Sequence, residues 1–263
     1  LARLVRDHDV VIAAGGDGTV NAVLNAILPN GATLGAIGLG SSNDFHKPIR
    51  PEQTIAGIPV RIRADRARAM DIGHAVFTDT RGASHSRYFC LNASVGMLAE
   101  GNAFFNTDDP TLRWLKRRSV DAAIFYAAAV NLIRFRPVHA TLHLDGALVR
   151  TNRFANLGVL KHVHITGGMR YDTPVQRDDG TFDVAVTERT QRASLVRTMA
   201  NLLRGRFQGL PGARCWRAKR VRIEPDRPIH LELDGEVVKV AAAELAVIPQ
   251  ALIYLQLPGP HQQ

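Results

Sequence analysis

Short apolar runs alternate with segments of helical spacing in the first part of the chain. Residues 10–14 (VVIAA) and 33–38 (TLGAIG) are unbroken apolar runs, and residues 19–28 repeat apolar side chains at intervals of three and four. Strands that are buried on both faces have such unbroken runs, and strands that alternate with helices usually form a parallel sheet. The pattern therefore predicts a small α/β unit, whose helix ends at the Pro-Asn-Gly triplet at 29–31.

From about residue 66 onward, apolar and polar positions alternate, as they do in antiparallel strands with one solvated face. Strands are expected at 67–77, 87–96, 138–150, 153–162, 181–188, 219–225 and 228–240. Asp-Gly pairs at 145–146 and 234–235 lie within such runs and predict tight hairpins. Helical spacing predicts one long helix at 111–135 and a shorter one at 193–206. This second part reads as a larger, mainly antiparallel β domain.

Composition and charge narrow the classes of partner. A hydrophobic share of 46% and a charged share of 22% are those of an ordinary globular protein. No apolar stretch reaches the roughly 18 residues that a membrane-spanning helix needs. The net charge of +9 favours an anionic partner, which could be nucleic acid, a membrane surface or a phosphorylated small molecule. Basic clusters at 61–68, 113–118 and 214–222 have no RNA-binding or zinc-finger spacing, so no nucleic-acid partner is expected. A solvated arginine-rich surface is the alternative.

Cysteine and histidine positions give no sign of a disulfide or metal framework. Cys90 and Cys215 are too few for a disulfide scaffold and lack metal-site spacing. His162 and His164 alternate with apolar residues as strand residues do, and we do not expect them to bind a metal ion. The first residues, LARLVRDHDV, have no signal-peptide pattern, so the expected compartment is a reducing cytosol.

A glycine-rich string, Gly15-Gly16-Asp17-Gly18-Thr19, separates the first predicted strand from the first helix. Glycines let backbone amides approach an anion, and the helix start adds the positive end of its dipole. The string is neither a Walker A loop nor GxGxxG, and the carboxylate of Asp17 would repel bare phosphate. A divalent cation or its bound waters would remove that repulsion, so the loop suits a magnesium nucleotide. The alternative is an ordinary turn with Asp17 as helix cap.

A second polar loop, Gly40-Ser41-Ser42-Asn43-Asp44, follows the second predicted strand. The carboxyl ends of parallel strands meet at one edge of a sheet, where ligands of open α/β sheets bind. We therefore expect this loop to lie beside the glycine-rich string. Ser-Asn-Asp sequences are also common in turns, so the loop alone is weak evidence for a site.

Two acidic positions lie farther along the chain. Asp71, in RAMDIG, would on its own be a surface or turn residue. Asp234-Gly235-Glu236 is explained by a hairpin turn alone. The functional alternative makes Asp234 a general base that accepts the proton of an attacking hydroxyl, with Glu236 close by to orient it.

Several separated strings, taken in order, resemble the catalytic region of the diacylglycerol kinase family, which includes bacterial soluble lipid kinases and sphingosine kinases. These strings are GGDGT at 15–19, GSSND at 40–44, MDIG at 70–73, NASVGMLAE at 92–100, the segment 167–184 and DGE at 234–236. The NAD kinases share only GGDGT and have an Asn-Glu motif where this chain has Asn43-Asp44. The resemblance covers nearly the whole chain and therefore favours a lipid kinase.

The resemblance implies an α/β plus mainly β fold with two domains. A nucleotide-binding α/β domain would span residues 1–63, and an antiparallel β-sandwich acceptor domain would span 64–246, with a tail at about 247–263 that returns to the first domain. ATP and the acceptor would meet in the cleft between them. The family has a longer segment before GGDGT, so we expect N-terminal strands of the first domain to be missing from this chain.

The resemblance also assigns roles to residues, with ATP and Mg²⁺ as cofactors. The nucleotide phosphates would be contacted by Gly15, Gly16, Asp17, Gly18, Thr19, Ser41, Ser42 and Asn43. A water-mediated magnesium network would be formed by Asp17, Asp44 and Asp71. Asp234 would be the base, with Glu236 beside it. Family members also hold a structural cation, whose ligands here would be Asp179 and the carbonyl groups of Gln176 and Thr181.

These expectations describe an ATP-dependent kinase that phosphorylates a membrane lipid, with diacylglycerol as the expected acceptor. It would be cytoplasmic, with its basic surface in peripheral contact with anionic lipid at the inner membrane face. One alternative is a kinase for a soluble alcohol, such as NAD or a polyol, which would need no micelle or vesicle. Another is a non-catalytic nucleotide- or lipid-binding remnant. Whether the protein is a monomer or a homodimer is left open.

Overall fold

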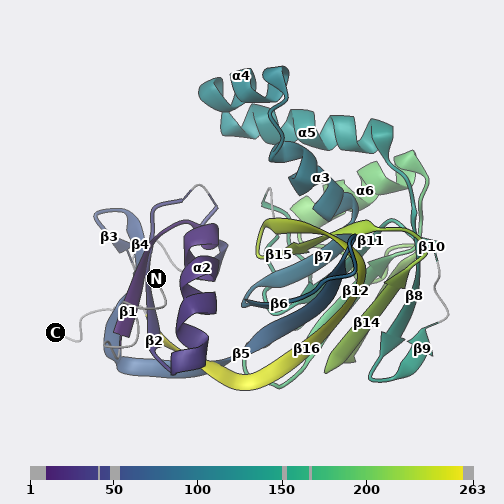
Figure 1. Ribbon diagram of the computed structural model, residues 1–263. Coiled ribbons are helices and arrows are strands. Elements are labelled where there is room, and N and C mark those ends of the chain that lie inside the picture. Colours follow the sequence, from purple (N-terminus) through teal and green to yellow (C-terminus); the bar gives the residue numbers. More distant parts are fainter. Residues whose placement is uncertain (1–9, 41, 48–53, 150–152, 166–167, 257–263) are drawn as a thin grey trace.

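Two lobes lie side by side in the computed structural model, and two long strands run through both of them (Figure 1). The structure describes residues 10–40, 42–47, 54–149, 153–165 and 168–256. The long strands are β5 (Arg63–Asp79) and β16 (Glu236–Gln256), which pair antiparallel. Both lobes therefore belong to one hydrogen-bonded sheet.

The smaller lobe contains the parallel strands that the apolar runs predict. β1 (Val10–Gly15) pairs in parallel with β2 (Thr33–Gly38), and α2 (Asp17–Ile27) connects them. The helix begins two residues earlier than predicted, because the extended Gly16 caps it and accepts a hydrogen bond from the Thr19 amide at 2.9 Å. The other elements of this lobe are η1 (Leu28–Asn30), η2 (Asp44–His46), β3 (Thr54–Ile55) and β4 (Ile58–Arg61).

The end of β16 returns to the smaller lobe. There Tyr254 pairs in parallel with Leu34 of β2. The core beneath α2 includes Leu24 and Leu34 together with Met70 of β5 and Leu252 of β16. Segments far apart in the sequence thus complete this core.

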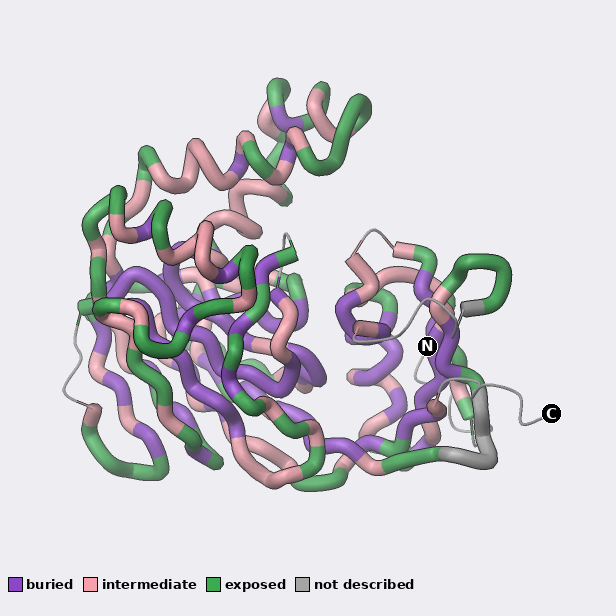
Figure 2. The backbone as a smooth tube through the Cα atoms, turned by 180° about the vertical axis from the view of Figure 1, so that it is seen from behind, coloured by how far each residue is buried: buried purple, intermediate pink, exposed green. Residues whose placement is uncertain are grey.

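The larger lobe is built from antiparallel strands, as the alternating pattern predicts. Its strands follow the order β10-β8-β14-β16-β15-β7-β11-β12-β13, and every neighbouring pair on this path is antiparallel. The path encloses one apolar core, in which the rings of Phe89 and Phe182 stack with centroids 5.7 Å apart. Buried residues accordingly run through these strands in Figure 2. The strand bounds are β6 (Ser84–Phe89), β7 (Asn92–Gly96), β8 (Val138–Leu144), β9 (Ala147–Val149), β10 (Arg153–Phe154), β11 (Asn156–Leu160), β12 (Phe182–Thr187), β13 (Ala213–Ala218), β14 (Arg220–Pro225) and β15 (Ile229–Leu233).

Both predicted Asp-Gly hairpins are confirmed. Asp145-Gly146 joins β8 to β9, and Asp234-Gly235 joins β15 to β16. In each turn both residues have positive φ, with values of 51° and 85° in the first and 49° and 89° in the second. These values are typical of the type I′ turn, which Asp-Gly pairs favour. The second turn places Asp234 at the tip of a hairpin.

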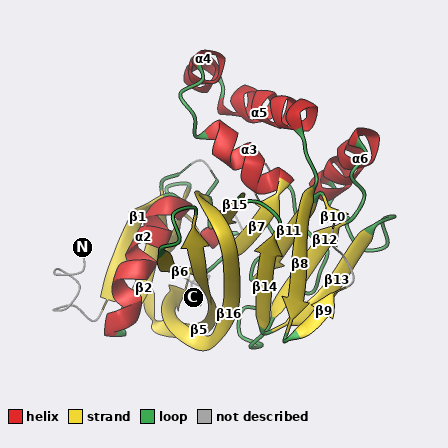
Figure 3. Ribbon diagram, turned by 45° about the vertical axis from the view of Figure 1, so that its right-hand side comes forward, coloured by secondary structure: helices red, strands yellow, loops and turns green. Residues whose placement is uncertain are grey.

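The helices gather at one end of the larger lobe (Figure 3). They are α3 (Met97–Phe105), α4 (Pro110–Arg118), α5 (Val120–Arg134) and α6 (Arg192–Leu203). The prediction of one helix over 111–135 is wrong, because Ser119 is extended and its hydroxyl caps α5 by accepting a hydrogen bond from the Ala122 amide at 3.2 Å. Among the residues that the structure describes, no helix combines the length and apolarity needed to cross a bilayer.

Candidate functional site

A cleft of about 410 Å³ is lined by residues from both lobes. Of the residues predicted to form the site, those that line it are Gly16, Asp17, Gly18, Ser42, Asp44, Asp234 and Glu236. Ser41 lies outside the described residues. Nucleotide contacts from Gly15, Thr19 and Asn43, which belong to the same loops, stay predictions. The structure thus joins the glycine loop, the second polar loop and the DGE turn in one cavity.

The two loops of the smaller lobe touch through their glycines. A Cβ on Gly40 would lie 2.4 Å from the Cα of Gly16, and one on Gly15 would lie 2.3 Å from the hydroxyl oxygen of Thr19. Leu39 also donates its amide to the carbonyl oxygen of Gly15 at 3.0 Å. Glycine is therefore required for close backbone contact at this edge of the sheet, where β1 and β2 both end. The predicted proximity of the two loops is confirmed.

Asn43 shapes the second loop from within. Its backbone has a φ of 50°, in the left-handed region that Asn tolerates better than most residues. Its side-chain oxygen accepts a hydrogen bond from the amide of Gly40 at 2.9 Å, and its side-chain nitrogen donates to the Gly40 carbonyl at 2.7 Å. The amide of Asn43 therefore closes the loop.

Two carboxylates of the smaller lobe line the cleft. Asp17 is the first residue of α2, and its Oδ1 accepts a hydrogen bond from the Phe45 amide at 2.9 Å. Burial raises the pKa of Asp17, while the amides of Phe45 and Asp44 oppose the rise. Asp44 forms an ion pair with Lys47 at 2.7 Å. Carboxylate oxygens are the ligands that Mg²⁺ prefers, so Asp17 and Asp44 are the residues that could hold a magnesium ion in this cleft.

Asp234 has a buried carboxylate that is held by four donors. Its Oδ1 accepts hydrogen bonds from the amides of Leu91 and Asn92 at 2.8 and 3.0 Å. Its Oδ2 accepts from the Cys90 amide at 2.8 Å and from the side-chain nitrogen of Asn21 at 2.9 Å. Burial raises the pKa of Asp234, and these hydrogen bonds oppose the rise. The result is a fixed carboxyl group with elevated proton affinity.

Two glutamates lie close to Asp234 in the sequence and also line the cleft. Glu236 is exposed and approaches the glycine loop, where a Cβ on Gly18 would lie 3.7 Å from its Oε1. Glu232 is buried and accepts a hydrogen bond from the hydroxyl of Ser94. Burial raises the pKa of Glu232, and the charge of Asp234 adds to that rise. Sequence reasoning missed Glu232, and its place two residues before Asp234, on the strand that leads into the turn, was the available signal.

Asn21 is the functional candidate that sequence reasoning missed in the smaller lobe. It lies on α2 and reaches Asp234 in the other lobe, 213 residues away in the chain. Asn25, one turn later, exchanges hydrogen bonds with the backbone of Tyr88 at 2.8 and 3.0 Å. Asp17, Asn21 and Asn25 form a polar stripe at intervals of four on α2, and that spacing was the available signal.

The structure does not bring Asp71 to the cleft with Asp17 and Asp44. Its carboxylate is fully buried, and its oxygens accept hydrogen bonds from the amides of Gln250 and Gly180 at 3.0 and 2.7 Å. The cleft lining of the described residues leaves it out. The predicted network that included Asp71 is corrected to this extent, because the oxygens of Asp71 are bonded to the amides of Gln250 and Gly180 and to the Lys161 ammonium.

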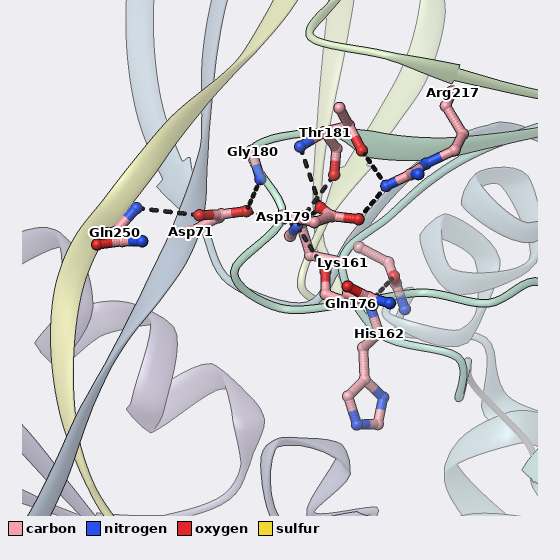
Figure 4. A network of polar contacts seen from close by, with 10 residues as sticks. Asp71, Lys161, His162, Gln176, Asp179, Gly180, Thr181, Arg217 and Gln250 are labelled. Carbon is pink, nitrogen blue, oxygen red and sulfur yellow. Dashed lines mark hydrogen bonds and ion pairs between the residues drawn. The ribbon is translucent and has the colours of Figure 1, made fainter.

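The residues predicted to ligate a structural cation do lie together, around a lysine (Figure 4). The ammonium of Lys161 contacts Asp71 Oδ2 at 2.8 Å and Asp179 Oδ1 at 3.1 Å. It also donates to the carbonyl oxygens of Gln176 and Thr181 at 2.7 and 2.9 Å. Sequence reasoning did not anticipate the lysine, because nothing local in the sequence marks Lys161 as buried.

The two histidines near this cluster have structural contacts. The Nδ1 atom of His162 lies 3.2 Å from the amide nitrogen of His164, which donates to it. Burial lowers the pKa of His162 to about 3, so the ring is neutral at physiological pH. Within the described part of the chain, no group of three His, Cys, Asp or Glu side chains could hold a metal ion by itself. Magnesium held by Asp17 and Asp44 would therefore need water or nucleotide oxygens as further ligands.

Two family models match the chain, one for each part. The diacylglycerol kinase catalytic domain matches residues 1–75, and the YegS C-terminal NAD kinase beta sandwich-like domain matches residues 102–256, more than half of the chain.

Curated relatives and solved structures agree with these models. A diacylglycerol kinase of Bacillus subtilis (strain 168) is 29% identical over 236 residues, which are 88% of this chain and 72% of that protein. One of Staphylococcus haemolyticus (strain JCSC1435) is 29% identical, covering 89% of this chain and 66% of that protein. The crystal structure of a diacylglycerol kinase from Bacillus anthracis str. Sterne superposes with a TM-score of 0.66 at 18% identity, over 98% of this chain and 79% of that one. The last likeness concerns the fold alone.

Proposed function

This chain belongs to the diacylglycerol kinase catalytic family, and we propose that it transfers the γ-phosphoryl group of ATP to the hydroxyl of a membrane lipid, with diacylglycerol as the first candidate. One observation carries the proposal. The fixed carboxyl group of Asp234 lines the same cleft as the glycine loop, although more than two hundred residues separate them. A base for a hydroxyl and a cradle for phosphates thereby face one cavity.

The smaller lobe supplies the nucleotide side of the proposed reaction. Gly16 and Gly18, at the start of α2, line the cleft, so their backbone amides would contact the phosphates there, and Ser42 would add a hydroxyl. Asp17 and Asp44 would hold a magnesium ion through water. When bound, that ion neutralises charge that develops on the phosphates.

The larger lobe supplies the acceptor side. Asp234 would take the proton of the lipid hydroxyl while the hydroxyl oxygen forms a bond to the γ-phosphorus of ATP. The bond between the γ-phosphorus and the bridging oxygen would break and release ADP. The four donors on Asp234 fill the acceptor positions of its two oxygens, so one donor must yield before a proton is accepted. Asn21 is the only side chain among the four, and its amide is also bonded to the Tyr88 carbonyl and the Asn25 side chain. We therefore assign it a positioning role that links the two lobes.

The direct test is transfer of labelled γ-phosphate from ATP to diacylglycerol and other lipids in mixed micelles, with NAD and soluble polyols as competing acceptors. Incorporation into lipid that depends on the micelle supports the proposal. Labelling of the soluble alcohols alone would favour a kinase for a soluble acceptor. No transfer to any acceptor by a protein that still binds Mg-ATP would favour a binding protein without catalysis.

The pH dependence of this reaction follows from the base. A general base acts in its ionised form, so activity is expected to fall as pH decreases through the pKa of Asp234. Because burial raises that pKa, the acidic limb of kcat should lie above the ordinary aspartate value of about 3.9. Turnover measured across pH at saturating Mg-ATP and lipid checks this. An acidic limb at or below the ordinary aspartate pKa would contradict the assignment of Asp234 as a base with a raised pKa.

The helical pair α4–α5 supports a peripheral contact with anionic lipid at the inner membrane face. α4 has Lys116, Arg117 and Arg118 in its last turn, and Trp114 on it is 56% exposed. Phe125 of α5 is 78% exposed. The pair projects from the larger lobe in Figure 1. Asn106, a few residues before α4, lines the cleft, so the pair is connected directly to the cleft wall. Basic and aromatic residues together are suited to a membrane interface.

Neutralising two exposed arginines of α4 is expected to weaken membrane binding. Each basic residue near an anionic surface contributes about 1 kcal/mol. The double variant Arg113→Gln/Arg117→Gln should therefore bind vesicles containing phosphatidylserine about 30-fold more weakly at low salt. Vesicle co-sedimentation measures the affinity. Arg81→Gln/Arg222→Gln, which removes the same charge from exposed positions elsewhere, is the control. Equal losses in both double variants would show a non-specific effect of net charge.

A further inference from the structure

A buried ammonium occupies the place at which the family resemblance implies a structural cation. Lys161 follows the last residue of β11, and its side chain has no exposed area. Its nitrogen lies within 3.1 Å of all the predicted ligand oxygens, from Gln176, Asp179 and Thr181, and of Asp71 Oδ2. We infer that the Lys161 ammonium is the structural cation of this protein, so that this chain uses a covalently attached charge where the resemblance implies a bound metal ion.

Lysine and metal ion exclude each other at this place. A calcium or magnesium ion binds oxygens at about 2.0–2.6 Å, so an ion shared by the same oxygens would occupy nearly the same point as the lysine nitrogen. The ammonium has three protons to donate and meets two carboxylate and two carbonyl oxygens. Hydrogen bonds can thus satisfy the ammonium fully. The residues present therefore do not fit a metal ion here.

The local charges also leave little net negative charge for a metal ion. Asp71, Asp179 and the nearby Asp183 are the carboxyl groups, and burial raises the pKa of Asp183. The buried Lys161 contributes one positive charge, and Arg217 a second at the exposed edge of Asp179. Burial pushes the pKa of Asp179 up, but the Thr181 amide and the Lys161 ammonium outweigh it and hold that pKa below its ordinary value. A divalent ion added to this group would leave an excess of positive charge in a buried environment, which is costly.

The Lys161 cluster lies next to the paired strands β5 and β16, which run through both lobes. Asp71 lies on β5, and its Oδ1 accepts the amide of Gln250 on β16. The pairing of these two strands is irregular between Ile248 and Leu252, and Gln250 has a φ of 48°. Figure 4 shows Asp71 between Gln250 and the Lys161 cluster. The ammonium therefore neutralises the carboxylate that ties together the two strands on which both lobes depend.

The wild-type protein is tested first, without nucleotide, by thermal unfolding in chelator and in excess Mg²⁺ or Ca²⁺. The expected Tm is the same in all three conditions, because the structural cation cannot be chelated. The inference would be overturned by a Tm that falls in chelator and recovers with metal, both in wild type and in Asp17→Asn, which lacks one of the two carboxylates proposed to hold magnesium in the cleft. This arm needs no variant of Lys161 and decides the question even if such variants do not fold.

Two substitutions of Lys161 separate charge from space. Lys161→Met fills similar volume without charge, and its Tm is expected to fall on the order of 10 °C with or without metal, because two carboxylates lose their buried partner. Lys161→Ala removes the charge and also opens space among four oxygens. Its Tm should fall in chelator and rise again, saturably, with Ca²⁺ or Mg²⁺.

Arg217→Met is the matched control, because Arg217 contacts the other oxygen of Asp179 but is 54% exposed. Its Tm should change by a small fraction of the Lys161→Met effect, since solvent screens exposed pairs. A Lys161→Met protein as stable as wild type would contradict the inference. So would a Lys161→Ala protein that no divalent ion stabilises beyond the wild-type response.

Discussion

Asp234→Asn is expected to lower kcat for lipid phosphorylation by about 10²- to 10⁴-fold, the range typical of a lost general base. The amide keeps the size of the side chain and cannot accept the hydroxyl proton. In wild type both carboxylate oxygens accept backbone amides, from Cys90 on one side and from Leu91 and Asn92 on the other. The NH₂ group of the asparagine must face one of these sides, where two donors would then oppose each other. Steady-state transfer to diacylglycerol in mixed micelles, together with Mg-ATP binding by calorimetry, separates lost chemistry from lost binding.

The Asp145-Gly146 hairpin provides a control for replacing Asp by Asn in a turn of the same type. Asp145 has a φ of 51°, close to the 49° of Asp234, and its Oδ1 accepts hydrogen bonds from the amides of Lys219 and Arg220 at 2.9 and 2.8 Å. Asp145→Asn makes the same substitution at a turn that does not line the cleft, and its side-chain oxygen can keep both of these backbone donors. Its turnover should stay near that of wild type. Near-normal turnover in Asp234→Asn would eliminate Asp234 as the base.

Asp17→Asn is expected to lower kcat/KM on the order of 10²-fold and to raise the magnesium concentration needed for half-maximal rate. The asparagine oxygen can still accept the Phe45 amide, so contact between the two loops is kept while the negative charge is lost. That charge is the feature that allows a cation to sit between the glycine loop and phosphate. Rates measured over a magnesium titration at fixed ATP give both values.

Asp121→Asn controls for the general effect of losing an acid from the first turn of a helix, since Asp121 has that position in α5. It should leave the magnesium dependence unchanged. A wild-type magnesium curve in Asp17→Asn would show that Asp17 does not organise the ion. A parallel loss in both variants would point to a change in the protein's overall charge.

Local sequence pattern predicted the elements whose formation depends on neighbouring residues. The unbroken apolar runs of β1 and β2 and their parallel pairing follow from burial on both faces. The Asp-Gly hairpins follow from the positive φ that their turn type requires. The proximity of the Gly16 and Gly40 loops follows from parallel strands that end at the same edge.

Local pattern failed where a single polar residue decides between two local structures. The helical spacing from 111 to 135 continues across Ser119, yet this residue is extended and caps α5. Periodicity of apolar side chains is similar for one long helix and for two short ones. The two cases differ in whether a side chain, here that of Ser119, accepts a hydrogen bond from a backbone amide and so caps a new helix. The spacing of apolar residues does not show this.

The sequence by itself determined the parallel and antiparallel parts of the fold, the two loops and the Asp-Gly turn of this kinase-family chain, because each depends on residues close together in the chain. Only the tertiary structure decided which distant groups share a contact. Asn21 of the smaller lobe meets Asp234 of the larger lobe, and Asp71 meets Lys161 beside the β5–β16 pairing. Burial of such residues and the pairing of their charges depend on how distant strands pair and pack, and local sequence pattern does not determine that packing.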